Sequence, residues 1–95
     1  MTSYYTLTWF KEELAPRFAG FAVVYRFCGE GDFGTLERVE FESDVLLGTL
    51  DFWSHDWLDV HVIDRVSVEE RLNLFLGPDQ ETDKAQALAA LLGLL

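Results

Sequence analysis

The sequence is short of positive charge and of long apolar runs, and each shortage excludes a class of protein. Its 95 residues contain seven Lys plus Arg against seventeen Asp plus Glu, which gives a formal net charge of −10. Because such a chain is repelled by nucleic-acid phosphates and by anionic lipid, we expect no direct binding to nucleic acid or membrane. The sequence also lacks any apolar run of about 18 residues, the length of a membrane-spanning helix.

Cysteine is almost absent as well. The only one, Cys28, cannot form an internal disulfide, and two histidines are too few for a His/Cys metal cluster. The first ten residues lack the basic and apolar segments of a secretory signal. We therefore expect a cytoplasmic protein without a cofactor or metal, in which Cys28 is a small apolar residue of a strand.

The chain is rich in apolar residues, at 49%, and in aromatic residues, at 15%. This content separates it from disordered acidic chains, which lack the apolar surface that offsets chain entropy. Its length predicts a single domain over residues 1–95. No repeat occurs, and Pro16 and Pro78 separate elements rather than marking a linker.

Five or six segments have the composition or alternation of strands. Residues 4–10 are rich in Tyr, Thr and Trp and predict a strand, followed by a helical turn over 11–15 that Pro16 ends. Residues 29–34 contain three glycines and predict a hairpin loop; a phosphate loop is not expected, because no Lys-Ser/Thr follows and two acids lie within the segment. The other expected strands are residues 21–28, 35–42, 45–53, 57–64 and 70–76, with a helix as the alternative for the last.

The clearest helix covers residues 80–95, with Asp79 or Thr82 as the expected N-cap. An apolar stripe at helical spacing would cover the inner face of the sheet. We therefore predict an α+β fold: an antiparallel five- to six-stranded meander over residues 4–76, packed on one face by a C-terminal helix. The stripe consists of Leu88, Leu91, Leu92 and Leu95.

A hairpin that turns at residues 54–56 keeps the alternation of both its strands intact. Its inner side then pairs Phe52 with Leu58, and Leu50 with Val60. Its outer side places two carboxylates directly opposite each other, which costs about 0.2 to 1 kcal/mol. The outer pairs are Trp53 with Trp57, Asp51 with Asp59, and Thr49 with His61.

Acidic charge is concentrated around this hairpin. Residues 37–70 contain ten acids against Arg38 and Arg65, so 2 − 10 = −8 of the net charge lies there. Acids that steer a partner and aromatics that anchor it predict a surface for a basic protein. The alternative is a solvated face whose tryptophans pack under the N-terminal segment. The expected contact residues are Glu40, Glu42, Asp51, Trp53, His55, Asp56, Trp57, Asp59 and His61.

Catalysis is not expected. Asp51 and Asp59 lie side by side on an exposed face without a pocket between them, unlike a general acid and base. His55 and His61 would face the same side of a regular strand, but His55 falls in the loop, so we expect no metal there.

Two segments resemble the central sheet of small acidic immunity proteins from bacterial contact-dependent growth inhibition and related polymorphic toxin systems: 47–53 (LGTLDFW) and 57–62 (WLDVHV). Size, acidity, a strand-rich middle and a C-terminal helix are also similar. The resemblance implies a cytoplasmic antitoxin that binds a toxin domain, frequently a nuclease, in a 1:1 complex. It makes Asp51, Trp53, Asp56, Trp57, Asp59 and His61 candidates for toxin contact.

Two other functions remain open. A DNA-mimicking inhibitor of another nucleic-acid enzyme would space its acids like phosphates, and a small-molecule-binding domain would have a pocket between helix and sheet. On the immunity hypothesis, the double substitution Asp51→Lys with Asp59→Lys should abolish binding and leave the fold intact.

Overall fold

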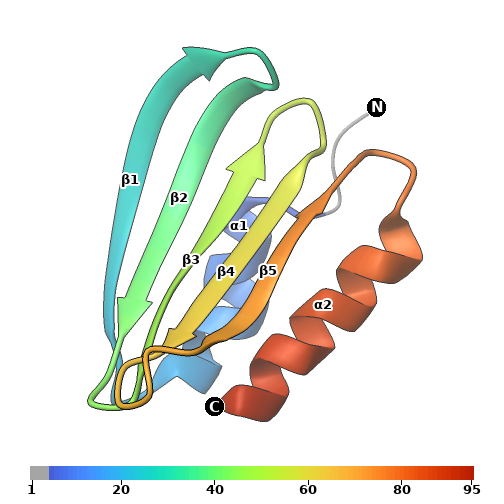
Figure 1. The fold of residues 1–95 in the computed structure, drawn as a ribbon. Helices are drawn as coiled ribbons and strands as arrows, with labels where there is room; N and C mark the ends of the chain where they lie inside the picture. Colours follow the sequence, from blue (N-terminus) through green and yellow to red (C-terminus); the bar gives the residue numbers. More distant parts are fainter. Residues whose placement is uncertain (1–4) are drawn as a thin grey trace.

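The computed structural model describes residues 5–95, which form one antiparallel sheet with helices on a single face (Figure 1). The strands follow one another across the sheet in chain order, and helix α2 (Glu81–Leu94) comes last. The predicted α+β meander with a C-terminal helix is therefore confirmed. The strands are β1 (Ala22–Gly31), β2 (Gly34–Glu42), β3 (Leu46–Trp53), β4 (Leu58–Asp64) and β5 (Glu70–Leu76).

The predicted N-terminal strand is wrong, apart from Tyr4, which lies outside the described residues. The segment is helical, and the sheet begins only at Ala22. Phe10, Leu14 and Phe18 are spaced four residues apart, so a helical backbone buries all three on one face, which outweighs the strand propensity of Tyr, Thr and Trp. The helical pieces are α1 (Leu7–Trp9), the π-helical η1 (Phe10–Leu14) and the 3-10 helix η2 (Ala15–Phe18).

Strand pairing follows the predicted alternation. Leu50 lies opposite Val60, and Phe52 opposite Leu58. The first hairpin is tighter than expected, because β1 continues to Gly31 and β2 begins at Gly34. The extra length of β1 is taken up by an irregularity in its pairing between Phe27 and Glu30.

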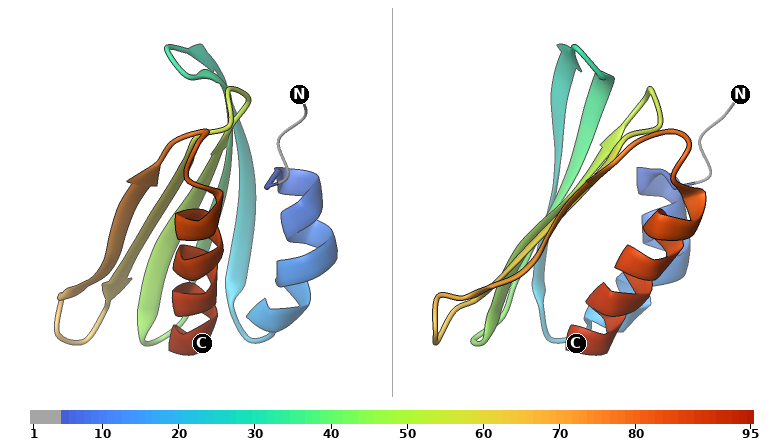
Figure 2. Two further views of the ribbon diagram at one scale, coloured as in Figure 1. Left: turned by 90° about the vertical axis from the view of Figure 1, so that its right-hand side faces the viewer. Right: turned by 45° about the vertical axis from the view of Figure 1, so that its right-hand side comes forward.

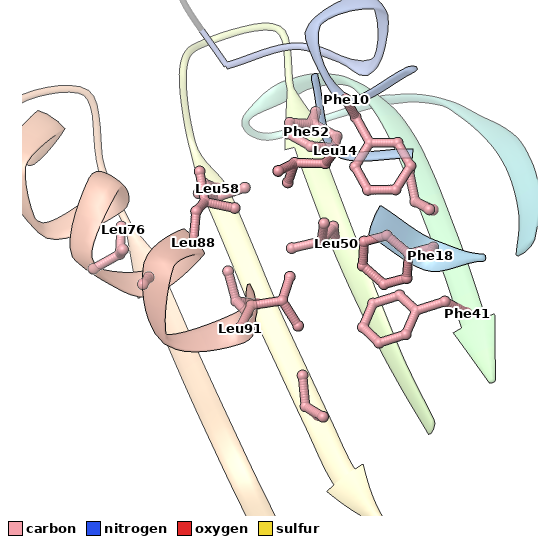
Figure 3. Close-up of a cluster of buried hydrophobic side chains, with 14 of the residues drawn as sticks. Phe10, Leu14, Phe18, Phe41, Leu50, Phe52, Leu58, Leu76, Leu88 and Leu91 are labelled. Atoms are coloured by element: carbon pink, nitrogen blue, oxygen red, sulfur yellow. The ribbon is translucent and has the colours of Figure 1, made fainter. Parts of the chain in front are cut away.

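Two helical segments cover the same face of the sheet (Figure 2). The N-terminal pieces lie over one part of this face and α2 over another. Phenylalanines from the N-terminal pieces and leucines from α2 meet the inward side chains of β2 to β5 (Figure 3). In β3, Gly48 leaves room for the ring of Phe41, which occupies the place of a Cβ at that position. The C-terminal helix alone therefore does not complete the core.

Helix α2 buries Leu88 and Leu91 as its stripe predicts, whereas Leu95 is exposed. Its N-cap is Gln80, not Asp79 or Thr82, and the Gln80 side chain does not cap the helix. That side chain instead accepts a hydrogen bond from the backbone N–H of Gly77 at 2.8 Å. The Gln80 side-chain oxygen is therefore bound by the loop before the helix and accepts no hydrogen bond from the N–H groups of the first helical turn.

Candidate functional site: the open face of the sheet

The candidate site is the sheet face opposite the helices, which we call the open face (Figure 2). It carries the outward side chains of all five strands. Three parts succeed one another along the strands: an aromatic cluster, a charged row and an apolar hollow. Their central members are Phe33, Trp53, Trp57 and Phe75 in the cluster, Arg38, Asp51 and Asp59 in the row, and Val24, Leu47, Thr49, His61 and Ile63 in the hollow.

The charged row contains a partly buried ion pair, in which Asp51 is buried and the Arg38 side chain is 36% exposed. Arg38 on β2 donates from Nε to Asp51 Oδ1 at 2.7 Å and from Nη2 to Oδ2 at 2.9 Å, across paired strands. The hydrogen bond and charge of Asp51 raise the pKa of Arg38 above its usual value, against the effect of burial. Asp51 is only 4% exposed. The pair of freely exposed carboxylates expected from the hairpin is therefore not formed.

This pairing also overturns the expectation that Asp51→Lys with Asp59→Lys leaves the fold intact. A lysine at position 51 would be buried against the guanidinium of Arg38, and an uncompensated buried charge strongly destabilises a fold. The sequence offered a signal for the pair, since strand alternation over residues 35–42 puts Arg38 on the same face as Glu40 and Glu42. The sequence did not reveal the register of β2 against β3, which places Arg38 opposite Asp51.

Asp59 differs from its neighbour. It lies opposite Asp51 as predicted, but it has no cation within ion-pair distance among residues 5–95. Partial burial raises its pKa first and the charge of Asp51 second, while His61 and Arg38 act in the opposite direction. The open face therefore holds a partly buried carboxylate whose charge is not fully compensated.

The hollow lies beside the charged row and has a volume of about 350 Å³. Its floor is apolar, because the small side chains of Ala22 and Thr49 lie among Val24, Leu47 and Ile63. Three exposed pairs lie at or near its rim: Arg26 with Glu40 at 2.8 Å, Arg65 with Glu42 at 3.1 Å, and His61 with Glu70 at 3.3 Å. Sequence reasoning missed the hollow, since it arises only where four strands bring their side chains together.

The tryptophans pack in the aromatic cluster. Trp57 stacks on Phe75 with ring centroids 4.8 Å apart, and Phe33 contacts Trp53 and Trp57 at 5.5 and 5.0 Å. Trp53 Nε1 is buried and has no hydrogen-bond partner within the described chain, so it is not available to a partner. Trp53 and Trp57 therefore pack against Phe33 and Phe75 and not mainly under the N-terminal segment. Phe75, which was not among the contact residues expected from the sequence, is the exposed ring of the cluster.

His55 and Asp56 lie in the turn between β3 and β4, at the end of the sheet. Asp56 has a left-handed backbone with φ of 69°. Its carbonyl oxygen and Oδ1 accept contacts from Lys84 Nζ at 2.7 and 3.1 Å, and Glu81 Oε1 lies 3.2 Å from the same nitrogen. Asp56 therefore secures α2 to the turn. His55 is exposed, and in the part of the chain that the structure describes no three His, Cys, Asp or Glu side chains are placed to hold a metal.

Lys84 is the largest departure from the sequence prediction. Its side chain is 1% exposed although it lies in a helix between acidic and small residues. Its alkyl stem can line the core while the ammonium reaches the oxygens of the turn. The one sequence signal was its position four residues before Leu88, on the buried stripe of α2.

Ion pairing reduces the charge concentration inferred from residues 37–70. Five of the ten acids there contact an arginine or lysine, and three of those cations come from outside the segment. The acidic surplus that remains on the open face is therefore smaller and more localised than the sequence count. The five paired acids are Glu40, Glu42, Asp51, Asp56 and Asp64.

Compared with models of protein families, with curated proteins and with solved structures, the chain matches none of them. None of the helices within residues 5–95 combines the length and the apolarity that crossing a membrane requires. The site must therefore be interpreted from its own geometry.

Proposed function

We propose that the protein binds a basic partner protein through the open face and acts as a cytoplasmic immunity protein that neutralises a toxin domain. The observation that carries the proposal is the uncovered sheet face with apolar side chains among acids. Val24, Leu47 and Phe75 on this face are 45%, 42% and 45% exposed. Exposed apolar side chains next to charged ones are typical of protein interaction sites.

The charge of the chain selects the kind of partner. A net charge of −10 steers a basic protein toward the surface and accelerates their encounter. Nuclease toxins present lysines and arginines to phosphates, so they are basic where an inhibitor must bind. The resemblance of residues 47–53 and 57–62 to immunity proteins points to the same class of partner.

The arrangement of the acids favours this proposal over DNA mimicry. A DNA mimic needs free carboxylates at regular spacing, whereas Asp51, Glu40 and Glu42 are each paired with an arginine of the chain. A pocket of about 390 Å³ does lie between β5 and α2, where a small-molecule site was expected, but four of its six lining residues are exposed, so it would not enclose a ligand.

The first test is whether the gene immediately upstream encodes a large secreted protein with a variable C-terminal domain, and the second is co-expression with that domain. We expect a 1:1 complex on size-exclusion chromatography and restored growth of cells that express the domain. Leu47→Arg on the open face should weaken binding at least about tenfold, because it places a cation against a basic partner. Ala89→Arg, on the exposed side of α2, makes the same change in charge and should bind normally.

Failure of the wild-type protein to bind and to restore growth would contradict the proposal. Equal loss of affinity in Leu47→Arg and Ala89→Arg would contradict its assignment to the open face, since net charge alone would then explain the effect. Circular dichroism of both variants verifies that each retains the fold.

A further inference from the structure

We infer that Asp59 and the hollow form a two-point site for a partner segment in which an arginine or lysine lies next to a large apolar side chain. This inference rests on the proposed function and adds the chemistry of the contact. The cation pairs with Asp59, and the apolar side chain enters the hollow.

Asp59 is the acid of the charged row that forms no ion pair within residues 5–95. Across the sheet, Asp51 has Arg38, Glu40 has Arg26 and Glu42 has Arg65, while Asp59 has no ion pair among the described residues. Ionised Asp59 is disfavoured in the free protein by burial and by Asp51. A cation from a partner would offset both the burial of Asp59 and its repulsion by Asp51. Binding would therefore stabilise an ionised carboxylate that is unfavourable in the free protein.

The residue opposite Asp59 favours a cation as well. Phe75 is its partner on β5, is 45% exposed and is held by stacking on Trp57. A guanidinium or ammonium group close to an aromatic ring is attracted by the ring electrons. A carboxylate next to a fixed ring therefore matches arginine in particular, whose planar group can pair and stack at once.

The hollow provides the second point at a defined spacing. His61 and Thr49, which line it, lie two residues along their strands from Asp59 and Asp51, a step of roughly 7 Å. Side chains two apart on a strand, or one turn apart on a helix, span a similar distance. One short segment of a partner can therefore reach both points. The apolar floor and the ion-paired rim match an anchor residue surrounded by polar contacts.

A second copy of this chain does not meet these requirements. Each copy carries a net charge of −10, so two open faces would repel each other and neither would supply the missing cation. The exposed arginines of the face, Arg26 and Arg65, are already paired. The occupant is accordingly a basic partner.

The test measures affinity for the same toxin domain by isothermal titration calorimetry. Asp59→Asn removes the charge at the first point, and Asp79→Asn, in the exposed loop before α2, is its control with the same change in net charge. Thr49→Arg fills the hollow, and Ala89→Arg is its control. We expect each site variant to weaken binding at least about tenfold and each control to stay within about twofold.

Thr49 is on a central strand, so Val24→Arg on edge strand β1 supplies a second variant of the hollow that endangers the fold less. If the wild type binds and Asp59→Asn or both folded hollow variants bind equally well, the two-point site is refuted while the proposed function stands. If the wild type does not bind, the proposed function fails and the inference fails with it.

Discussion

The two faces of the sheet are made by the same strands but stabilised in different ways. On the covered face, Val39, Leu50, Phe52 and Val60 are between 0 and 3% exposed and contact helices. On the open face, their immediate neighbours in sequence form ion pairs across strands, pack in the aromatic cluster or remain partly exposed. The comparison teaches that alternation assigns each residue to a face, whereas its energetic role depends on whether a second layer covers that face.

The largest expected difference between the faces comes from two leucines of β3. Leu50→Ala should lower the free energy of unfolding by about 2 to 5 kcal/mol, because it opens a cavity in the core. Leu47→Ala on the open face should cost less than about 1 kcal/mol, since its side chain is partly in water already. Urea unfolding of both variants measures the contrast. Similar losses would mean that the open face is covered in the free protein.

A smaller effect separates two arginine pairs on the open face itself. Arg38→Ala should cost about 1 to 3 kcal/mol, because it leaves the buried Asp51 unpaired next to Asp59, with a discount for the partial exposure of Arg38. Arg26→Ala breaks the exposed pair with Glu40 and should cost at most about 1 kcal/mol. Equal costs in urea unfolding would contradict the distinction between a framework pair and a rim pair.

The smallest effect is the opposite sign of the contributions that two carboxylates, Asp59 and Asp64, make to stability as the pH changes. The pKa of Asp59 is raised in the folded protein, so its ionisation opposes folding. Asp59→Asn should therefore stabilise the protein at pH 7, and the gain should shrink as the pH falls through the raised value toward 3.8, its usual value. Unfolding midpoints of wild type and variant between pH 7 and 4 measure this trend.

Asp64 is the matched control, with the opposite sign. The backbone N–H groups of Ser67 and Val66 donate to it and lower its pKa, so ionised Asp64 stabilises the fold. Asp64→Asn should destabilise the protein at pH 7, and the loss should fade only below pH 3.8, as the pH falls through the lowered value. Since both variants change net charge equally, shifts of the same sign would refute the local origin of the effect.

The strands could be predicted because their signal is local. Alternation in 35–42, 45–53 and 57–64 identified the inward residues, and the short turn at 54–56 gave the pairing of β3 with β4. The N-terminal segment misled because its aromatic residues suit a strand or a buried helix equally. Only the presence of uncovered sheet, onto which Phe10, Leu14 and Phe18 could pack, decided between them.

The site could be predicted only in outline. Its face and its acids followed from alternation, and Asp51 and Asp59 were correctly placed opposite each other. Their difference did not follow, because it depends on Arg38 from another strand. Asp56 and the buried Lys84 are separated by 28 residues, and no periodicity connects them.

Local patterns were thus sufficient to predict which segments form strands and which residues share a face, since both depend on residues a few positions apart. The composition was sufficient to predict the predominance of negative charge. Packing between distant segments determined which carboxylate is paired with a cation, against which rings Trp53 and Trp57 pack, and where the open face forms a hollow. The physical reason is that burial and electrostatic compensation depend on every neighbour in space, and most neighbours of Asp59 and the hollow come from other strands.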